Sequence, residues 1–405
     1  MIEPMAASTL RSTDFDLSVL QTETEWDAIA PEWNRLTAQC SGAAVFSTWE
    51  WLRPWWRHYR RAGDRLYIVT ARSGGELVGV APLYRRSIAL FGLPIFERLG
   101  FVGDDSGDSE YLDFIYDDRH APRVIEVLTE KIFEKETPWQ VCELRMLPPE
   151  SPTPEVVQRS ASVRGWKTDL YHTSTFAVLL PDTWEEYLCT LRPRFRTKIR
   201  SLLRKLSDNN TWEISRCSSV GELEPTLSSL FSLHQERWTR EGEAGSFASD
   251  ARRRFYTDMA CGLLEKNRLH FYTLFHEGEP ISHEFSFEYK KKMYFLQQSF
   301  DCSRPKLSPG TALKANVIRE CIAAGIRVYD FLGGDDPYKQ NWGVSQMSIP
   351  NIDIYRKDFR ASAAYYGPKA LLALKKALHE YVPETWMSRS RERLRRIREM
   401  QNGHR

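Results

Sequence analysis

Apolar residues recur along this chain with two different spacings. From Ile281 to Tyr289, every second residue is apolar or aromatic except His283, and serines and glutamates fill most positions between them. This alternation predicts a strand, because successive side chains of a strand point to opposite faces of a sheet. Other segments carry apolar residues three or four positions apart, as an amphipathic helix does, for example at Trp26, Ile29, Trp33 and Leu36.

Applied along the chain, these spacings predict interleaved helices and strands. Helices are predicted at residues 24–39, 46–61, 119–135, 154–163, 192–206, 220–239, 250–265 and 308–323. Strands are predicted at residues 15–20, 65–72, 77–85, 96–102, 111–116, 139–147, 268–273, 281–289, 293–300 and 327–332. This order favours an α/β (α+β) fold with mixed sheets.

Two predicted hairpins share their sequence in one register. Residues 65–70 and 268–273 have Arg, Leu and Thr at the same positions, and residues 75–76 and 278–279 are both Gly-Glu. The offset is constant, since 268 − 65 = 203 and 278 − 75 = 203. A strand, a helix and a strand follow each hairpin, which indicates a duplicated unit. We predict a disordered stretch at 1–14, α/β domains at 15–175 and 176–360, and a helical basic tail at 361–405.

A basic helix is predicted at residues 192–206, at the start of the second unit. No acidic residue occurs from Tyr187 to Ser207, and Arg196, Arg200 and Arg204 fall on one helical face. This face is either a solvated surface or a site for an anionic ligand, which unopposed like charges favour. The tail is also basic, with seven Arg against two Glu in residues 386–405, and we expect it to contact a protein or a membrane surface.

Composition narrows the function classes. The net charge of +2 does not imply a global polyelectrolyte partner, and 405 residues suggest two domains or more. Seven scattered cysteines without a Cys-x-x-Cys pair, and no His-x-x-x-His pair, indicate reduced thiols in a cytosolic protein and no metal site. No segment has the length and hydrophobicity of a membrane span or signal peptide. The acidic loop at 103–108 is interpreted as a solvated turn.

The stretch from 307 to 343 carries the strongest indications of chemistry. Ser308 is placed to cap a helix, Pro309 suits its first position, and Gly310 would let a ligand approach the backbone. Free N–H groups at a helix start suit a phosphate, although plain capping is the alternative. Asp330 lies in an apolar strand, where its carboxylate needs either a structural partner or a task. Lys339 is expected within its reach across the 333–337 turn.

These residues resemble a known family. The Phe46–Trp51 segment, the 77–83 strand, the 192–204 arginine run, Ser308-Pro309-Gly310 and above all the 329–339 stretch are similar to tandem GNAT acyltransferases. The resemblance is narrowest to the CelD-like branch of cellulose and exopolysaccharide biosynthesis, itself related to the FemABX peptidyltransferases. It implies two tandem GNAT-like domains and covers residues 15–359.

The resemblance also implies a reaction and its participants. An acyl thioester, acetyl-CoA or another acyl-CoA without a metal, would donate to an amine or hydroxyl of a small molecule, amino sugar or glycan precursor. The donor would bind at Ser308, Pro309, Gly310, Thr311, Ala312 and Leu313. Asp330, Glu284, Glu288 and His283 are the candidate catalytic residues. Candidate acceptor contacts are Asp336, Tyr338, Lys339 and Trp342, with Arg196, Arg200 and Arg204 on the basic helix.

Only the second unit is expected to bind the donor. The matching region of the first unit, 117–122, places Asp117 and Asp118 where a phosphate would be repelled. Two alternatives stay open. One is a FemABX-like transferase that uses aminoacyl-tRNA bound by the basic helix, and the other is a non-catalytic scaffold in polysaccharide export. Either way, the protein is expected to be cytoplasmic or peripheral at the inner membrane.

Overall fold

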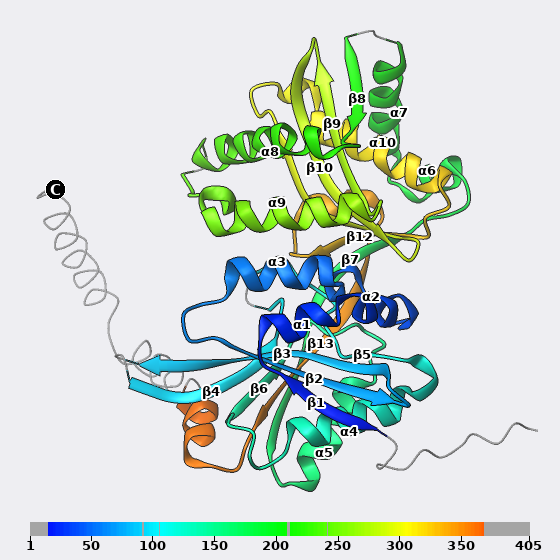
Figure 1. Ribbon diagram of the computed structural model, residues 1–405. Helices are drawn as coiled ribbons and strands as arrows, with labels where there is room; N and C mark the ends of the chain where they lie inside the picture. The colour runs from blue at the N-terminus through cyan, green and yellow to red at the C-terminus, as the bar shows by residue number, and fades with distance from the viewer. Residues whose placement is uncertain (1–14, 91–92, 105, 209–210, 241, 368–405) are drawn as a thin grey trace, which may run out of the picture.

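The computed structural model describes residues 15–367 except 91–92, 105, 209–210 and 241. The predictions for residues 1–14 and for most of the basic tail therefore lie outside the described residues. Two halves follow each other along the chain, residues 16–179 and 184–355. In Figure 1 the first half lies in the lower part and the second in the upper part, except for the strand 345–355, which runs into the lower part.

The first half follows the predicted alternation of elements. Its helices are α1 (Glu23–Ala28), α2 (Ala30–Gln39), α3 (Trp49–Tyr59), α4 (Ala121–Ile132) and α5 (Thr153–Val163). Its strands are β1 (Asp16–Leu20), β2 (Arg65–Ser73), β3 (Glu76–Leu90), β4 (Leu93–Phe101), β5 (Ile115–Tyr116), β6 (Val141–Leu144) and β7 (Lys167–Leu179). The predicted 24–39 helix is two helices, because the chain leaves helical geometry at Ile29 just before Pro31. The predicted 111–116 strand shrinks to β5.

The second half repeats this order. Its helices are α6 (Trp184–Thr190), α7 (Pro193–Asp208), α8 (Val220–Arg240), α9 (Asp250–Glu265) and α10 (Pro309–Ala323). Its strands are β8 (Trp212–Arg216), β9 (Leu269–His276), β10 (Glu279–Tyr289), β11 (Lys292–Phe300), β12 (Val328–Gly333) and β13 (Ser345–Tyr355). Strands β7, β8 and β13 were not predicted.

The two hairpins occupy equivalent places, as predicted. Leu66 pairs with Tyr84 in the β2–β3 hairpin, and Leu269 pairs with Phe287 in the β9–β10 hairpin. Each residue of the second pair lies 203 positions after its counterpart in the first pair. In the sheet, β3 and β10 are each followed by an antiparallel neighbour and then by a strand parallel to that neighbour. The pairing registers therefore support a duplicated unit.

A single continuous sheet joins the halves through two exchanged strands. Its order is β1-β2-β3-β4-β6-β13-β7-β12-β11-β10-β9-β8, with β5 on β3. Strand β13 of the second half lies between β6 and β7 and adds Ile349, Ile352 and Ile354 to the first hydrophobic core. Strand β7 pairs with β12 and adds Phe176 and Val178 to the second core. Each half thus lends its last strand to the other.

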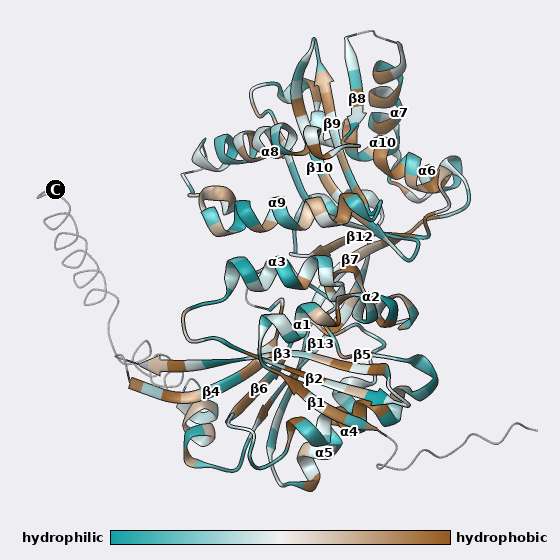
Figure 2. Cartoon of the chain, viewed as in Figure 1, coloured by the Kyte–Doolittle hydropathy of each residue, from teal (hydrophilic) through white to brown (hydrophobic). Residues whose placement is uncertain are grey.

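Helices cover both faces of the second-half sheet. On β10, His283 hydrogen-bonds to Ser229 of α8, whereas the next residue, Glu284, contacts Lys314 of α10. Because alternate residues of a strand face opposite ways, α8 and α10 lie on opposite faces. Figure 2 shows hydrophobic residues along the strands and hydrophilic residues recurring along α8 and α9. Helices α3 and α9 meet between the halves, where Arg57 and His58 contact Asp258.

Candidate active site

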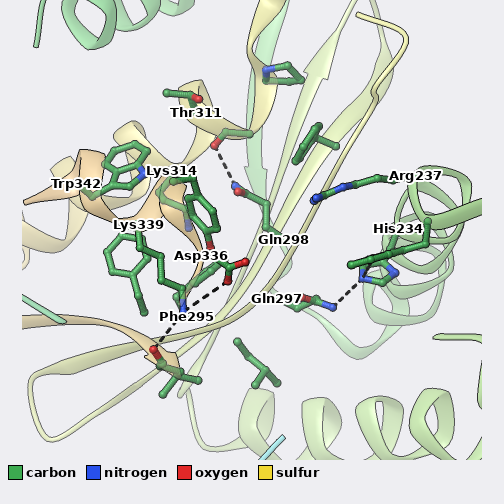
Figure 3. A pocket seen from close by; sticks show the side chains of 18 of the residues that line it. His234, Arg237, Phe295, Gln297, Gln298, Thr311, Lys314, Asp336, Lys339 and Trp342 are labelled. Carbon is green, nitrogen blue, oxygen red and sulfur yellow. Dashed lines mark hydrogen bonds and ion pairs between the residues drawn. The ribbon is translucent and has the colours of Figure 1, made fainter. Parts of the chain in front are cut away.

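A cavity of about 750 Å³ opens beside the start of α10. Its walls come from β11, the first turn of α10, the end of β12, the 336–342 loop, α8 and the first-half loop at 107–110. Figure 3 shows His234 and Arg237 of α8 on one side, and Lys339 and Trp342 on the other. The volume lies in the range of ligand pockets, which is about 300–1,000 Å³.

The cavity occupies a gap between two parallel strands. Strands β11 and β12 pair only where Lys292, Met293 and Tyr294 face Val328, Tyr329 and Asp330. Beyond this point the cavity is lined by Phe295 to Gln298 on one side and by Phe331 to Gly333 on the other. Backbone groups of a strand that has lost its neighbour can hydrogen-bond to a ligand.

The start of α10 forms the floor of the cavity. Ser308 occupies the N-cap position in the left-handed region, with φ 50°, and its side chain makes no capping hydrogen bond. Gly310 has a packing role beside the predicted one, because a Cβ there would meet Phe300 at 3.0 Å and Gln298 Oε1 at 3.3 Å. The glycine lets α10 approach β11, and Gln298 donates to the Gly310 carbonyl at 3.0 Å.

Predicted donor residues divide between the cavity and the core. Ser308, Pro309, Gly310 and Thr311 line the cavity. Ala312 and Leu313 are buried in the second hydrophobic core. The predicted donor set therefore combines wall residues with residues that anchor the helix.

A buried charge cluster lies behind the cavity wall. Lys314, which lines the cavity, donates to Glu284 Oε2 at 3.1 Å and to the Tyr329 hydroxyl at 3.2 Å, and Tyr329 donates to Glu284 Oε1 at 2.6 Å. Burial lowers the pKa of Lys314 to about 8, and Glu284 opposes this shift. Glu284 is fully buried, so it reaches the cavity through Lys314.

Asp330 is fully buried, and its carboxylate has three partners. Its carboxylate pairs with Lys292 at 2.6 Å and accepts from the Tyr111 hydroxyl at 2.7 Å and from the Leu332 N–H at 2.8 Å. The last bond holds Leu332 at φ 58°, a costly conformation for a residue with a Cβ. The expected partner, Lys339, instead donates to the carbonyls of Leu332 and Gly333.

The 336–342 loop supplies the predicted acceptor contacts. Asp336, Tyr338, Lys339 and Trp342 all line the cavity. Lys339 is 2% exposed, and burial lowers the pKa of its ammonium group. Asp336 lies 3.8 Å from it, and its carboxylate is largely exposed.

Two further candidates lie elsewhere. His283 is buried between Thr273 and Ser229, and burial lowers its pKa to about 3, so it is neutral at physiological pH. Glu288 lies 3.5 Å from His270 Nε2. Of the described residues that line the cavity, none is Asp330, Glu284, Glu288 or His283.

The basic face of α7 is exposed and begins near the cavity. Arg200 and Arg204 are exposed and Arg196 is half-buried, and Arg200 pairs with Glu185. At the start of the helix, the ring of Phe195 contacts Trp342 edge-on, with ring centroids 5.1 Å apart. The three arginines are not among the described lining residues.

The first half contributes two carboxylates that sequence reasoning missed. Asp108, interpreted as part of a solvated turn, is 1% exposed and accepts from Tyr59 and Tyr256 at 2.9 and 3.1 Å, and from Arg252. That interpretation is wrong for Asp108. Glu110 lines the cavity and accepts from the Gly333 N–H. Burial, and then the nearby charge of Asp330, raise the pKa of Glu110 to about 7. The only signal in the sequence was the acidic loop just before it.

The described residues contain no group of three or more His, Cys, Asp or Glu side chains able to hold a metal ion. No helix in the described part of the chain is long and apolar enough to cross a bilayer.

Comparisons with known proteins agree on the fold. Residues 193–340 match the family model described as an acetyltransferase (GNAT) domain. The structure titled FemX superposes with a TM-score of 0.57 at 13% identity, over 80% of this chain and 95% of that one. A conserved protein of unknown function from Bacteroides thetaiotaomicron VPI-5482 gives 0.52 at 9% identity, over 84% and 100%. No curated protein matches the chain. The predicted mixed α/β fold is confirmed, and the region that matches the GNAT model contains most of the cavity wall.

Proposed function

We propose that the protein is an acyltransferase that moves an acyl group from a thioester to an amine or hydroxyl. The observation that carries this proposal is the parting of β11 and β12 directly over the start of α10, within a region that matches a GNAT model. This gap offers strand edges for an extended donor arm and a helix start for its phosphates.

The donor is an acyl-CoA, with acetyl-CoA as the simplest form. Its arm lies along the free edge of β11, and its pyrophosphate meets the backbone at Ser308, Pro309, Gly310 and Thr311. Ala312 and Leu313 hold the helix against the sheet. Pro309 has no N–H, and the N–H groups of Thr311 and Ala312 donate to the Ser308 carbonyl at 3.0 Å. Ser308 makes no side-chain cap, so the N–H of Gly310 is the backbone donor of this turn that a phosphate would meet.

The acceptor enters beside the 336–342 loop. Lys339 and Asp336 offer a cation and an anion, and Tyr338 and Trp342 offer aromatic surface for an amino sugar or glycan precursor. A CelD-like role in exopolysaccharide or cellulose biosynthesis, in the cytoplasm or at the inner membrane surface, is consistent with these contacts. Arg196, Arg200 and Arg204 extend the acceptor site along α7 toward an anionic part of a larger substrate.

The predicted catalytic residues receive supporting roles in this proposal. Asp330 shapes the 330–333 bend, and Glu284 holds Lys314 at the cavity wall. His283 and Glu288 pack β10. None of these four residues is among the described residues that line the cavity. Each instead contacts other side chains of the protein, which supports a positioning role.

A second candidate is a FemABX-like transferase that uses aminoacyl-tRNA. The observation that favours it is the exposed arginine face of α7, which starts at Phe195 against the cavity residue Trp342. Such a face can follow a phosphate backbone. A non-catalytic scaffold in polysaccharide export would need neither donor.

Thermal unfolding with each donor separates these functions. Under the acyl-CoA proposal, CoA at 100 times its Kd stabilises the fold by about 2.7 kcal/mol, and the melting temperature rises accordingly. Under the tRNA alternative, CoA has no effect, and tRNA binding weakens steeply from 50 to 200 mM salt. A protein that responds to neither ligand would contradict both transferase proposals and favour the scaffold.

A further inference from the structure

We propose that Glu110, from the first half of the chain, takes the proton from the acceptor during acyl transfer. This inference rests on the proposed acyltransferase function and assigns the general base of that reaction. It makes the active site a composite of both halves, although the donor region lies wholly in the second.

The loop that carries Glu110 is fixed on both sides. Before it, Asp108 is tied to Tyr59 of α3, and to Arg252 and Tyr256 of α9. After it, the Tyr111 hydroxyl contacts Asp330 and Thr175, and Tyr111 itself is held at φ 53°. A left-handed, non-glycine residue that is itself one of the two buried anchors indicates a loop whose conformation is imposed by its surroundings.

One carboxylate oxygen of Glu110 is held by the protein, and the other is buried without a partner. Oε1 accepts from the Gly333 N–H. Among the described residues, none hydrogen-bonds to the buried Oε2. A buried carboxylate oxygen without a partner is costly. A small rotation of the side chain toward the cavity that Glu110 lines would bring Oε2 to an incoming N–H or O–H group.

Gly333 makes this arrangement possible. A Cβ at position 333 would lie 2.8 Å from Glu110 Oε1, closer than carbon and oxygen can approach. The glycine therefore allows the carboxylate to reach the end of β12, at the point where β11 and β12 have parted.

The surrounding charges suit a base that works near neutral pH. Burial and Asp330 disfavour the ionised form of Glu110, whereas the Gly333 N–H, Lys339 and Lys292 favour it. The balance gives a pKa of about 7. A base with a pKa close to the working pH combines a large ionised fraction with a useful proton affinity.

The proposed step is balanced without any further reactant. The acceptor nitrogen or oxygen attacks the thioester carbonyl carbon and forms the new C–N or C–O bond. Its proton passes to Glu110 Oε2. When the tetrahedral intermediate collapses, the carbonyl re-forms and the C–S bond breaks, and the leaving thiolate takes up, through water, the proton that Glu110 accepted, which restores the carboxylate.

The test compares E110Q with wild type over the pH range 5–9, using acetyl-CoA and a panel of primary amines and amino sugars. We expect wild-type kcat/KM to rise with pH through an inflection near 7. E110Q should lose about 10²- to 10⁴-fold in kcat/KM and should lose that inflection. Its melting-temperature shift with CoA should match wild type, because the donor region is intact.

Stability measurements show whether E110Q folds. A raised pKa means that the ionised carboxylate penalises the fold, so wild-type stability falls as the pH rises from about 4.5 toward 7. E110Q should therefore be at least as stable as wild type at pH 8, and the difference should shrink toward pH 4.5. The matched control is E155Q, because the side chain of Glu155 is 85% exposed on α5, and Glu155 contacts no residue assigned to the site. It should leave activity and stability unchanged.

Different results overturn different claims. If wild type transfers acetyl groups and folded E110Q keeps its rate and the same inflection, Glu110 is not the base, and the acyltransferase proposal stands. If wild type neither transfers an acyl group nor responds to CoA, the acyltransferase proposal fails, and the role of Glu110 fails with it. The G333A variant gives an independent check. Its added methyl group should push the Glu110 side chain aside and so lower kcat/KM, although the carboxylate is still present.

Discussion

At the scale of single residues, the buried carboxylate of Asp330 joins the end of β12 to Lys292 of β11 and to Tyr111 of the first half. An acid inside an apolar strand needed a partner, and the structure provides Lys292 and Tyr111. The expected partner was Lys339, which is close in sequence. The true partners depend on the parallel register of β11 and β12 and on a loop more than two hundred positions away, and neither is encoded locally.

Asp330→Asn is expected to destabilise the fold. The change removes the charge that pairs with Lys292 and weakens two hydrogen bonds, so the free energy of unfolding should fall by about 1–3 kcal/mol. Activity should follow the folded fraction, because Asp330 positions the cavity wall and is not among its described lining residues. Urea unfolding combined with turnover at matched folded fractions measures both effects.

The control for this variant is Asp182→Asn. Asp182 pairs with Arg327 close to the start of β12, but its side chain is 79% exposed, so its loss should cost less than about 1 kcal/mol. A stable Asp330→Asn variant whose turnover collapses would instead make Asp330 a direct participant in the reaction.

At the scale of elements, the close packing of α10 against β11 determines the shape of the cavity. The sequence predicted the helix, its Ser-Pro-Gly start and the strands on either side, because each has a local signature. It did not reveal that Gly310 faces Phe300 and Gln298, since that contact depends on how closely the helix approaches the sheet. The parting of β11 and β12 was likewise a tertiary feature.

Gly310→Ala is expected to push α10 away from β11. The added methyl group would meet Phe300 and Gln298, at a cost of about 1–3 kcal/mol, and CoA binding should weaken because the helix start moves. Gly221→Ala is the matched control, since Gly221 also occupies the second position of a helix, and no atom lies within 4 Å of its added Cβ. Calorimetric titration with CoA compares the two, and equal affinities would mean that the helix start does not hold the donor.

At the scale of the whole molecule, the exchange of β7 and β13 joins the halves into one sheet. The duplicated hairpins predicted two similar α/β units, and their registers agree with that prediction. The domain boundaries at 175 and 360 stay predictions. The exchanged strands escaped prediction because β7 is largely polar and exposed over its first half, without a buried face that alternation would reveal. Their partners are chosen by the assembled sheet.

Separated halves are expected to depend on each other. A fragment of residues 1–181 lacks β13 and therefore leaves the edge of β6 and the core around Ile352 uncovered. Expressed alone, it should aggregate, whereas co-expression with residues 182–405 should yield a complex that a tag on one fragment captures. A monomeric 1–181 fragment with cooperative thermal unfolding would contradict the mutual dependence of the halves.

A crystal structure of the full chain grown with CoA would show whether the gap between β11 and β12 is the donor site. We expect the pyrophosphate at Ser308–Thr311 and the pantetheine arm along the free edge of β11. No site is expected in the first half, where Asp117 and Asp118 precede α4. CoA bound at residues 117–124, or density for CoA at neither place in crystals soaked at saturating concentration, would contradict this assignment.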